Sequence, residues 1–330
     1  MPLKRVQKRE KLYRVILKYQ WILLGIGIVV SITASWMFPM HPDEKVFIEM
    51  AEIITRGGAP YRDMFDHKPP GIYLLLTPFV AIFGKNLIIL RLIPFFLNSI
   101  IGWLLYSTCR TISSRREGVL VAFLYLTIAP FYQANFILTE VPMTVCLLVG
   151  TRLALTCRQK KVSRGACLRR QEVFWIGFWI GMAIVFKQSA VVYSLLIPFF
   201  LLYSLKGFFT RKSLSLLGLY LVGLVIPITL TVLYLISQNI LAISYYQIIE
   251  YNIQSYHRSS ISVMVNFIPH LLFPIVLLWV FKKLTFDKTK IKPYYLYFIS
   301  SFIIAAIPLL LFRPYHHYWI PVLPYILLLL

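Results

Sequence analysis

Long apolar runs, separated by short polar or basic segments, recur along most of the chain. A helix needs about 20 mostly apolar residues to cross the hydrocarbon core, because every backbone polar group must be satisfied inside the segment. The pattern therefore predicts an all-α fold, a polytopic transmembrane helical bundle. Spans are expected near residues 19–39, 90–109, 117–135, 141–157, 173–189, 190–209, 214–237, 264–281 and 294–312, with a partial span over 318–330.

The last run is too short to cross by itself, so we expect a single transmembrane domain, 1–330, that continues in the natural protein. The run from Gly71 to Gly84 is also short and contains Pro78, which is typical of a segment at the membrane interface. If this run does not cross, the basic segments near 110–116, 158–170, 206–212 and 282–292 all lie with the N-terminus in the cytoplasm. The positive-inside rule requires that arrangement, and it makes 41–84 an outer loop with juxtamembrane helices.

Composition supports the same class. Hydrophobic residues make up 59% of the chain and charged residues 14%, with a mean hydropathy of +0.74, whereas a soluble domain carries roughly 25% charged residues. These values exclude a soluble enzyme, a disordered chain and a nucleic-acid-binding module, despite the net charge of +22. The basic residues 1–18 precede the first run without a cleavage site and predict an uncleaved signal anchor. We expect an integral protein of the bacterial plasma (inner) membrane with a cytoplasmic N-terminus.

Most acidic residues fall on the outer side in this topology, and acids contribute little to orientation. The first outer loop contains an expected amphipathic helix from Asp43 to Arg56, in which Phe47, Met50, Ala51 and Ile54 follow helical spacing. Gly57 and Gly58 end it. The concentration of carboxylates outside indicates that the outer face uses them in chemistry.

Asp43 and Glu44 lie in the first turn of that helix. One interpretation is structural, with Asp43 as the N-cap and Glu44 favoured by the helix dipole; the other is that a carboxylate fixed there acts as a base. Lys68 has two interpretations as well. It precedes two prolines that hold the chain extended, and it contacts either lipid head groups in general or one particular phosphate.

Two further charges lie at the ends of expected spans. Glu140 either assists a helix start or faces the same cavity as Asp43. Lys187 has almost no polar loop around it, and ionisable residues near lipid usually face a cavity or a partner. His316 and His317 are a weak metal signal because they are adjacent on one short loop, and Tyr318 is an ordinary interface anchor.

Six sequence pieces together resemble a known family. They are Asp43-Glu44 after the first span, GGAPYRDMFDHKPPGIYLL, Arg91 in ILRLIP, ILTEVPM, FKQSA and RPYHHYWIPVLP. Their order and spacing resemble the C-type superfamily of membrane glycosyltransferases, within it the branch of protein O-mannosyltransferases and the lipid A aminoarabinose transferase. Such proteins transfer a sugar from a polyprenyl-phosphate carrier to a lipid, glycan or protein acceptor on the extracytoplasmic side, usually with inversion, and the resemblance implies this activity here.

Carried over by position, the resemblance implies that Asp43 is the base, Glu44 accompanies it and Lys68 binds the donor phosphate. Lys187 and Arg91 are further candidates for the phosphate, and Glu140 stands where relatives often carry Asp. Substrate-pocket candidates are Tyr61, His67, His316, His317 and Tyr318. No cofactor is required, although a divalent metal at Asp43 and Glu140 is compatible with the motif.

The chemistry fits these residue types. Nucleotide sugars stay in the cytoplasm, so an outward-facing transferase needs a donor carried by membrane lipids. Displacement at the sugar needs a base for the acceptor and cations for the departing phosphate. The alternatives are a transporter or lipid flippase, and a ligase or polymerase of surface polysaccharide. Transporters place ionisable groups near the bilayer midplane, whereas here most acids lie in one outer loop, which favours surface chemistry.

Overall fold

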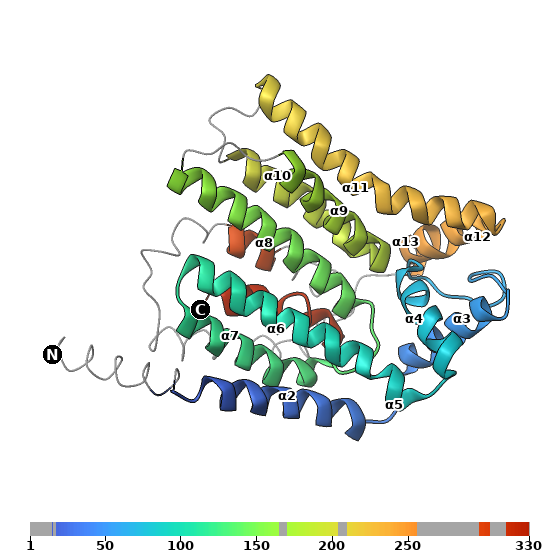
Figure 1. Cartoon of the computed structure of the whole chain (residues 1–330). Coiled ribbons are helices and arrows are strands. Elements are labelled where there is room, and N and C mark those ends of the chain that lie inside the picture. The colour runs from blue at the N-terminus through green and yellow to red at the C-terminus, as the bar shows by residue number, and fades with distance from the viewer. Residues whose placement is uncertain are drawn as a thin grey trace. The chain divides into compact units, whose positions relative to one another are not determined.

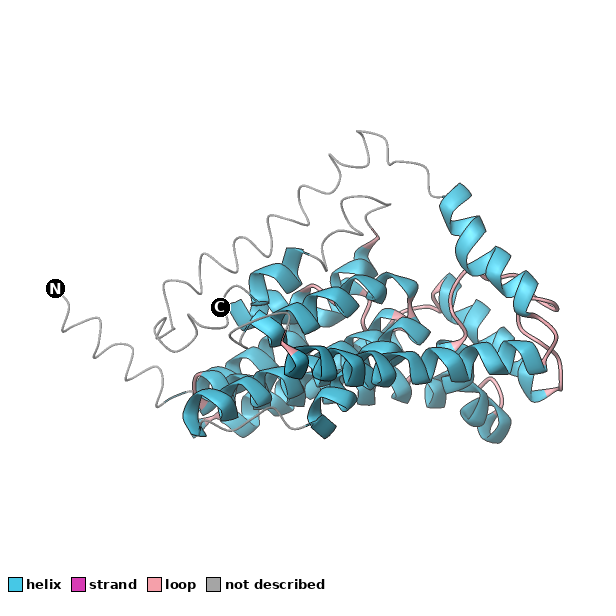
Figure 2. Ribbon diagram, turned by 90° about the horizontal axis from the view of Figure 1, so that it is seen from above, coloured by secondary structure: helices cyan, strands magenta, loops and turns pink. Residues whose placement is uncertain are grey.

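The computed structural model describes residues 15, 18–164, 170–203, 210–255, 297–303 and 315–329. Within these ranges the chain consists of helices joined by loops, without a strand (Figure 2). The predicted all-α fold class is therefore confirmed. The chain divides into two compact units, one formed by residues 1–37, 98–135 and 258–330 and the other by residues 38–97 and 136–257.

The first unit is built around the contact between α2 and α7. Its described elements are α2 (Gln20–Met37), most of α6 (Leu92–Ile112), α7 (Arg115–Ile128), η1 (Ala129–Tyr132), η4 (His316–Trp319) and α16 (Leu323–Leu329). α2 packs along α7, which α16 also contacts (Figure 1). The buried amide of Asn98 accepts a hydrogen bond from the Tyr125 hydroxyl at 2.7 Å and so links α6 to α7.

The second unit carries the outer-loop residues. Its elements are α3 (Pro42–Thr55), α4 (Gly71–Phe83), α5 (Leu87–Leu90), the start of α6, α8 (Glu140–Arg164), α9 (Arg170–Phe186), η2 (Gln188–Val192), α10 (Tyr193–Tyr203), α11 (Arg211–Ser237), α12 (Leu241–Tyr245), η3 (Tyr246–Glu250) and α13 (Tyr251–Ser255). α8, α9 and α11 pack in that order, and α3, α4, α12 and α13 gather beyond one end of them (Figure 1).

The contact between α9 and α11 is a close backbone approach. A Cβ added at Gly177 would lie 2.0 Å from the carbonyl oxygen of Tyr220, so no larger residue fits there without separating the helices. Helix pairs in membranes use small residues in this way, because van der Waals packing replaces the hydrophobic effect between them. This contact fixes the position of α9, whose C-terminal end leads directly into the candidate site.

Four described helical segments are long and apolar enough to cross a membrane: Gln20–Met37, Leu87–Ile112, Glu140–Cys157 and Ser213–Ser237. They coincide with four of the expected spans, and the chain is an integral membrane protein. In the most apolar window of α8, 78% of the residues are buried, against 22% in α11. α8 is therefore an inner helix of its unit, whereas α11 exposes the apolar surface expected of a helix that faces lipid.

Other expected spans fall on shorter elements or outside the description. The run 117–135 is divided between α7 and η1, 173–189 corresponds to the 17-residue α9, and 190–209 begins with η2 before α10. The span 264–281 lies outside the described residues, as does most of 294–312. The partial span over 318–330 corresponds to part of η4 and to α16.

The outer-loop helix forms nearly as predicted. α3 covers Pro42–Thr55 and buries Phe47, Met50 and Ala51, which are positions of the predicted apolar face. That face packs on α4, the short run that begins at Gly71. α4 has 13 residues, fewer than a span requires, and its location at the membrane interface stays a prediction.

Candidate active site

The start of α3 positions two neighbouring carboxylates. His41, not Asp43, is the N-cap, because its Nδ1 accepts a hydrogen bond from the backbone N–H of Asp43 at 3.2 Å. Glu44 Oε2 accepts from the backbone N–H of His41 at 2.9 Å and completes a capping box. The interpretation of Asp43 as an N-cap is therefore wrong. Because its carboxylate does not cap the helix, it can contact residues from other segments.

Glu44 forms a fully buried pair with Arg91. The guanidinium donates from Nη2 to Glu44 Oε2 at 2.8 Å and from Nε to Oε1 at 3.3 Å. It also donates to the carbonyl oxygens of Phe38 and Pro39, at 2.7 and 2.9 Å. The side chains of Arg91 and Glu44 are 3% and 0% exposed. This geometry does not support the predicted phosphate-binding role of Arg91, since its donors point to protein oxygens.

Glu44 is also tied to the start of α8. Its Oε1 accepts a hydrogen bond from the backbone N–H of Ile137 at 2.9 Å. One carboxylate thus joins three segments: the α3 cap, the Arg91 guanidinium and the chain leading to Glu140. Charge-assisted bonds of this kind are strong in a dry environment, so Glu44 holds the surrounding backbone in place.

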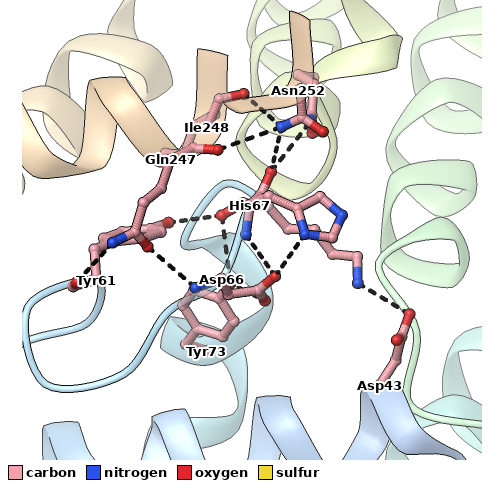
Figure 3. Close-up of polar contacts among 10 residues, drawn as sticks. Asp43, Tyr61, Asp66, His67, Tyr73, Gln247, Ile248 and Asn252 are labelled. Atoms are coloured by element: carbon pink, nitrogen blue, oxygen red, sulfur yellow. Dashed lines mark hydrogen bonds and ion pairs between the residues drawn. The ribbon is translucent and has the colours of Figure 1, made fainter. Parts of the chain in front are cut away.

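Asp43 forms a more open pair with Lys68. Lys68 Nζ donates to Asp43 Oδ2 at 2.9 Å, and the two side chains are 12% and 29% exposed. The ammonium group also lies over the Phe47 ring, 4.7 Å from its centroid. The sequence candidates for base and phosphate partner are therefore in direct contact, as the ion pair in Figure 3 shows.

The Lys68 ammonium is held in its charged form. Burial lowers its pKa, but the charges of Asp66 and Asp43, the hydrogen bond to Asp43 and the charge of Glu140 together raise the pKa above its usual value. His67 responds in the opposite direction: burial and the neighbouring Lys68 charge lower its pKa. At neutral pH the site therefore presents a cationic Lys68 beside a neutral His67.

A second ion pair lies close by. Lys187 Nζ donates to Glu140 Oε1, and these side chains are 12% and 3% exposed. Lys187 occupies the N-cap position of η2 in extended conformation, just after α9 ends. The chain that follows Lys68 packs closely against the end of α9 at Gly71. A Cβ atom at Gly71 would lie only 2.5 Å from the carbonyl oxygen of Val185, so a larger residue does not fit there. Lys187 thus has Glu140 as its charged partner, and its charge also interacts with those of Lys68 and Asp43. A cavity shared by Glu140 and Asp43 stays a prediction.

The segment before Lys68, residues 61–68, lacks regular structure and is here called the strap. Tyr61 is fully buried and donates from its hydroxyl to the Lys68 carbonyl oxygen at 2.7 Å. Tyr73 donates to the Asp66 carboxylate. The Asp66 backbone N–H donates to Gln247, and Asn252 donates to the His67 carbonyl oxygen (Figure 3). Tyr61 therefore supports the backbone of the strap through its hydroxyl.

The remaining pocket candidates belong to the first unit. His317 is buried and its Nδ1 lies 3.1 Å from Gln133 Oε1. Tyr315 stacks on the His317 ring, and the Tyr318 ring meets it edge-on. His316, by contrast, is exposed. A substrate-binding role for these three candidates, His316, His317 and Tyr318, stays a prediction.

Sequence reasoning missed four residues of the second unit that contact the strap: Tyr73, Gln188, Gln247 and Asn252. Tyr73 and Gln188 lie inside two of the sequence pieces that resemble the glycosyltransferase family, so their positions could have marked them as site residues. Gln247 and Asn252 lie about 180 residues beyond the strap, in the tyrosine-rich segment 238–263. The sequence leaves two interpretations of that segment open, an aromatic belt on the membrane or a cover over a sugar site, and neither singles out these two amides. Among the residues that the structure describes, no three His, Cys, Asp or Glu side chains gather as a metal site would require.

These features define an α-helical integral membrane protein with a cluster of paired charges beside its helix ends. The family model for dolichyl-phosphate-mannose-protein mannosyltransferases matches residues 67–236. That match covers half of the chain, from the strap through α11, and the chain belongs to this family. The predicted membership of the C-type glycosyltransferase superfamily is thereby confirmed.

Solved structures agree with this assignment. ArnT from Cupriavidus metallidurans bound to undecaprenyl phosphate is similar, with a TM-score of 0.66 and 16% identity over 94% of this chain and 59% of ArnT. The apo state of the same ArnT gives 0.66 and 17% over 95% and 59%. Identity this low shows the fold alone, and the chain spans 59% of the length of ArnT. No curated protein matches the sequence significantly.

Proposed function

We propose that this protein is a glycosyltransferase that moves a sugar from a polyprenyl-phosphate carrier to an acceptor on the extracytoplasmic face. The observation that carries the proposal is the open Asp43–Lys68 pair with Lys187–Glu140 beside it. The family supports sugar transfer over transport. The undecaprenyl phosphate bound to ArnT supports a polyprenyl-phosphate donor.

The two lysines are suited to a phosphate. Lys68 and Lys187 come from different segments and are close enough for their charges to interact. Lys68 pairs with Asp43, and Lys187 pairs with Glu140. An arriving donor phosphate competes for Lys68 Nζ. When Lys68 turns to the phosphate, the Asp43 carboxylate loses its cation and gains the freedom to accept a proton.

The transfer step then balances without a cofactor. The acceptor hydroxyl or amine attacks the anomeric carbon, and its proton passes to the Asp43 carboxylate. The bond between the anomeric carbon and the phosphate oxygen breaks with inversion, and the electron pair leaves with polyprenyl phosphate. Lys68 and Lys187 stabilise the charge that develops on that phosphate. The leaving phosphate needs no proton, which suits the neutral His67 in the site.

The buried pair supports this site from behind. Glu44 and Arg91 are assigned a positioning role, because their contacts hold the α3 start and the Ile137 backbone. Glu140, at the first turn of α8, holds the Lys187 ammonium group by a direct contact and offsets part of the cost of burying its charge. Asp43 is thus the one carboxylate of the cluster that is both paired and partly open.

The orientation of the site follows from charge. The basic N-terminal segment and the basic loops lie in the cytoplasm under the positive-inside rule, which puts α3, the strap and α4 outside. Acceptors compatible with such a site are lipids, glycans and proteins at the outer surface. We extend the proposal to a bacterial plasma membrane, where undecaprenyl phosphate is the carrier to test first.

The test uses the purified protein in lipid nanodiscs with radiolabelled undecaprenyl-phosphate sugars and envelope acceptors. Wild-type protein is expected to release the label to an acceptor, and Asp43→Asn to lower turnover about 100- to 10,000-fold, the contribution of one general base. Asp63→Asn is the matched control, since Asp63 lies in the same loop but pairs with the exposed Arg62. Near wild-type turnover by Asp43→Asn would remove Asp43 as the base. In sealed proteoliposomes, label that crosses the bilayer without transfer would identify a transporter.

A further inference from the structure

The strap lacks regular structure of its own, yet it determines where Lys68 lies. Tyr61, at its start, has a φ of +65°, a conformation that a bulky residue keeps only when its surroundings impose it. Within the second unit, tyrosine side chains fix the far end. The Tyr61 hydroxyl donates to the Lys68 carbonyl oxygen at 2.7 Å, and the Tyr73 hydroxyl, which donates to the Asp66 carboxylate, lies 3.3 Å from the same carbonyl oxygen. The start and middle of the strap are held from elsewhere.

That second support comes from η3 and α13. Gln247 is 4% exposed; its Oε1 accepts from the Asp66 backbone N–H at 3.1 Å, and its Nε2 donates to the Tyr61 carbonyl oxygen at 2.8 Å. Asn252 Nδ2 donates to the His67 carbonyl oxygen at 2.8 Å. Figure 3 shows both amides directed at the strap. Residues 246–250 form a π-helical turn, a rare geometry that is frequent at functional sites.

The Gln247 amide is suited to holding the strap backbone. It bridges one donor and one acceptor of the strap backbone, because a side-chain amide carries both an acceptor oxygen and donor N–H groups. Both backbone groups are buried with it, so losing the amide leaves two polar groups without their partners, which is costly. The strap then relaxes at Tyr61 and Asp66, immediately before Lys68.

We propose that Gln247, assisted by Asn252, is a positioning residue that sets the place of the Lys68 ammonium beside Asp43. The role in catalysis rests on the proposed function, in which Lys68 binds the donor phosphate. The position itself does not depend on that function. The link therefore connects the π-helical turn at Gln247, which follows the strap residue Asp66 by 181 positions, to the cation of the site.

The test variant is Gln247→Met, which keeps the length and volume of the side chain but removes both hydrogen bonds. Ser244→Ala is the matched control, because Ser244 is buried on α12 and donates only within its own helix, to the Ile240 carbonyl oxygen at 2.6 Å. Asn252→Ala is a second test variant should Gln247→Met fail to fold. All are made in the full-length protein in nanodiscs.

Two measurements are combined. The first is the rate at which an amine-acylating reagent modifies Lys68, followed by mass spectrometry, which needs no knowledge of the substrate. The second is the Kd and the stoichiometry of undecaprenyl phosphate binding. With Gln247→Met we expect Lys68 to be modified about ten-fold faster and the Kd to rise about ten-fold, the effect of losing roughly one net hydrogen bond, with unchanged stoichiometry.

The outcomes separate the possibilities. A lower stoichiometry with the same Kd means that Gln247 only keeps the protein folded, and it overturns the proposal, as does an unchanged modification rate of Lys68. Equal effects in Ser244→Ala also overturn it. If Lys68 becomes more reactive in Gln247→Met but wild-type protein does not bind undecaprenyl phosphate, the positioning of Lys68 is supported and the proposed function fails.

Discussion

Asp43 and Glu44 are adjacent on one helical turn, and each pairs with a cation from a distant part of the second unit. Glu44 lies behind the helix start, where Arg91 and two backbone N–H groups surround it completely. Asp43 faces the strap and pairs with Lys68 (Figure 3), with almost a third of its side chain exposed. The two carboxylates differ in surroundings rather than in chemistry.

The difference in burial suggests different roles for the two carboxylates of this short motif. A buried ion pair is costly to form and costly to break, because a single charge left in the interior lacks both water and partner. Such a pair keeps its geometry. A partly open pair is weaker and exchanges partners with an incoming ligand at a smaller cost. Glu44 therefore suits a fixed support, and Asp43 suits a group that must change its partner during a reaction.

Breaking the buried pair is expected to have the largest effect on stability. Arg91→Ala leaves Glu44 buried without its cation, and we expect the unfolding free energy to fall by about 3–5 kcal/mol. Unfolding by SDS in mixed micelles, followed by tryptophan fluorescence, measures this change. Binding of undecaprenyl phosphate per folded molecule should weaken less than in a variant without Lys68, because Arg91 points to protein oxygens and acts on the site only through the backbone that it holds.

The control for this experiment is Lys85→Ala. Lys85 lies six residues before Arg91 and pairs with Glu52 and Glu49 at the exposed surface, so the same loss of charge there should leave the unfolding midpoint unchanged. An Arg91→Ala protein as stable as wild type would show that the Glu44 environment is not dry. The distinction between the two carboxylates would then be lost.

Breaking the Asp43–Lys68 pair is expected to affect ligand binding strongly and stability only slightly. Lys68→Met should lower the unfolding free energy by only about 1 kcal/mol, since Asp43 regains water. Undecaprenyl phosphate binding should weaken about ten- to a hundred-fold, as expected when one charge-assisted hydrogen bond to a phosphate is removed. Isothermal calorimetry in nanodiscs, combined with the SDS unfolding assay, measures both quantities.

Lys45→Met is the matched control for charge. Lys45 follows Glu44 on α3 and is exposed, so this variant has the same net charge as Lys68→Met without touching the pair. If both variants weaken binding equally, the general charge of the surface attracts the lipid phosphate and Lys68 has no specific role. If Lys68→Met destabilises as much as Arg91→Ala, the pair is structural.

The sequence predicts the scaffold better than it predicts these roles. Helical spacing over Phe47, Met50 and Ala51 predicts the buried face of α3 correctly, because periodicity is a local signal. Asp43 and Glu44 look equivalent in the sequence, and the capping by His41 that separates them depends on side-chain direction. The partners are distant as well: Arg91 is 47 residues from Glu44, and Gln247 is 186 from Tyr61. Motif positions indicated Arg91 but not its contacts with Glu44, Phe38 and Pro39, since a spacing does not say what a guanidinium faces.

A third ion pair in the same loop, Arg62–Asp63, is the most exposed of the three pairs compared. Breaking it is expected to have the smallest effect on stability. Arg62 Nε donates to Asp63 Oδ1 at 2.9 Å, with side chains 55% and 36% exposed. The hydrogen bond from Arg62, together with the Ala59 backbone N–H, lowers the pKa of Asp63 to about 2 from its usual 3.8. Its contribution to stability is therefore present above pH 3.8 and is lost as the pH falls towards 2.

We expect this contribution to be small, because solvent and salt screen an exposed pair. The measurement is the difference in thermal unfolding midpoint between wild type and Asp63→Asn, taken at neutral pH and near pH 2 in low and high salt. The difference should be slight at neutral pH and should shrink with added salt and as the pH falls to about 2. Arg91→Ala should stay destabilised when salt is added, because a buried pair is screened much less. An Asp63→Asn effect as large as that of Arg91→Ala, or one that grows in acid, would contradict burial as the property that separates these pairs.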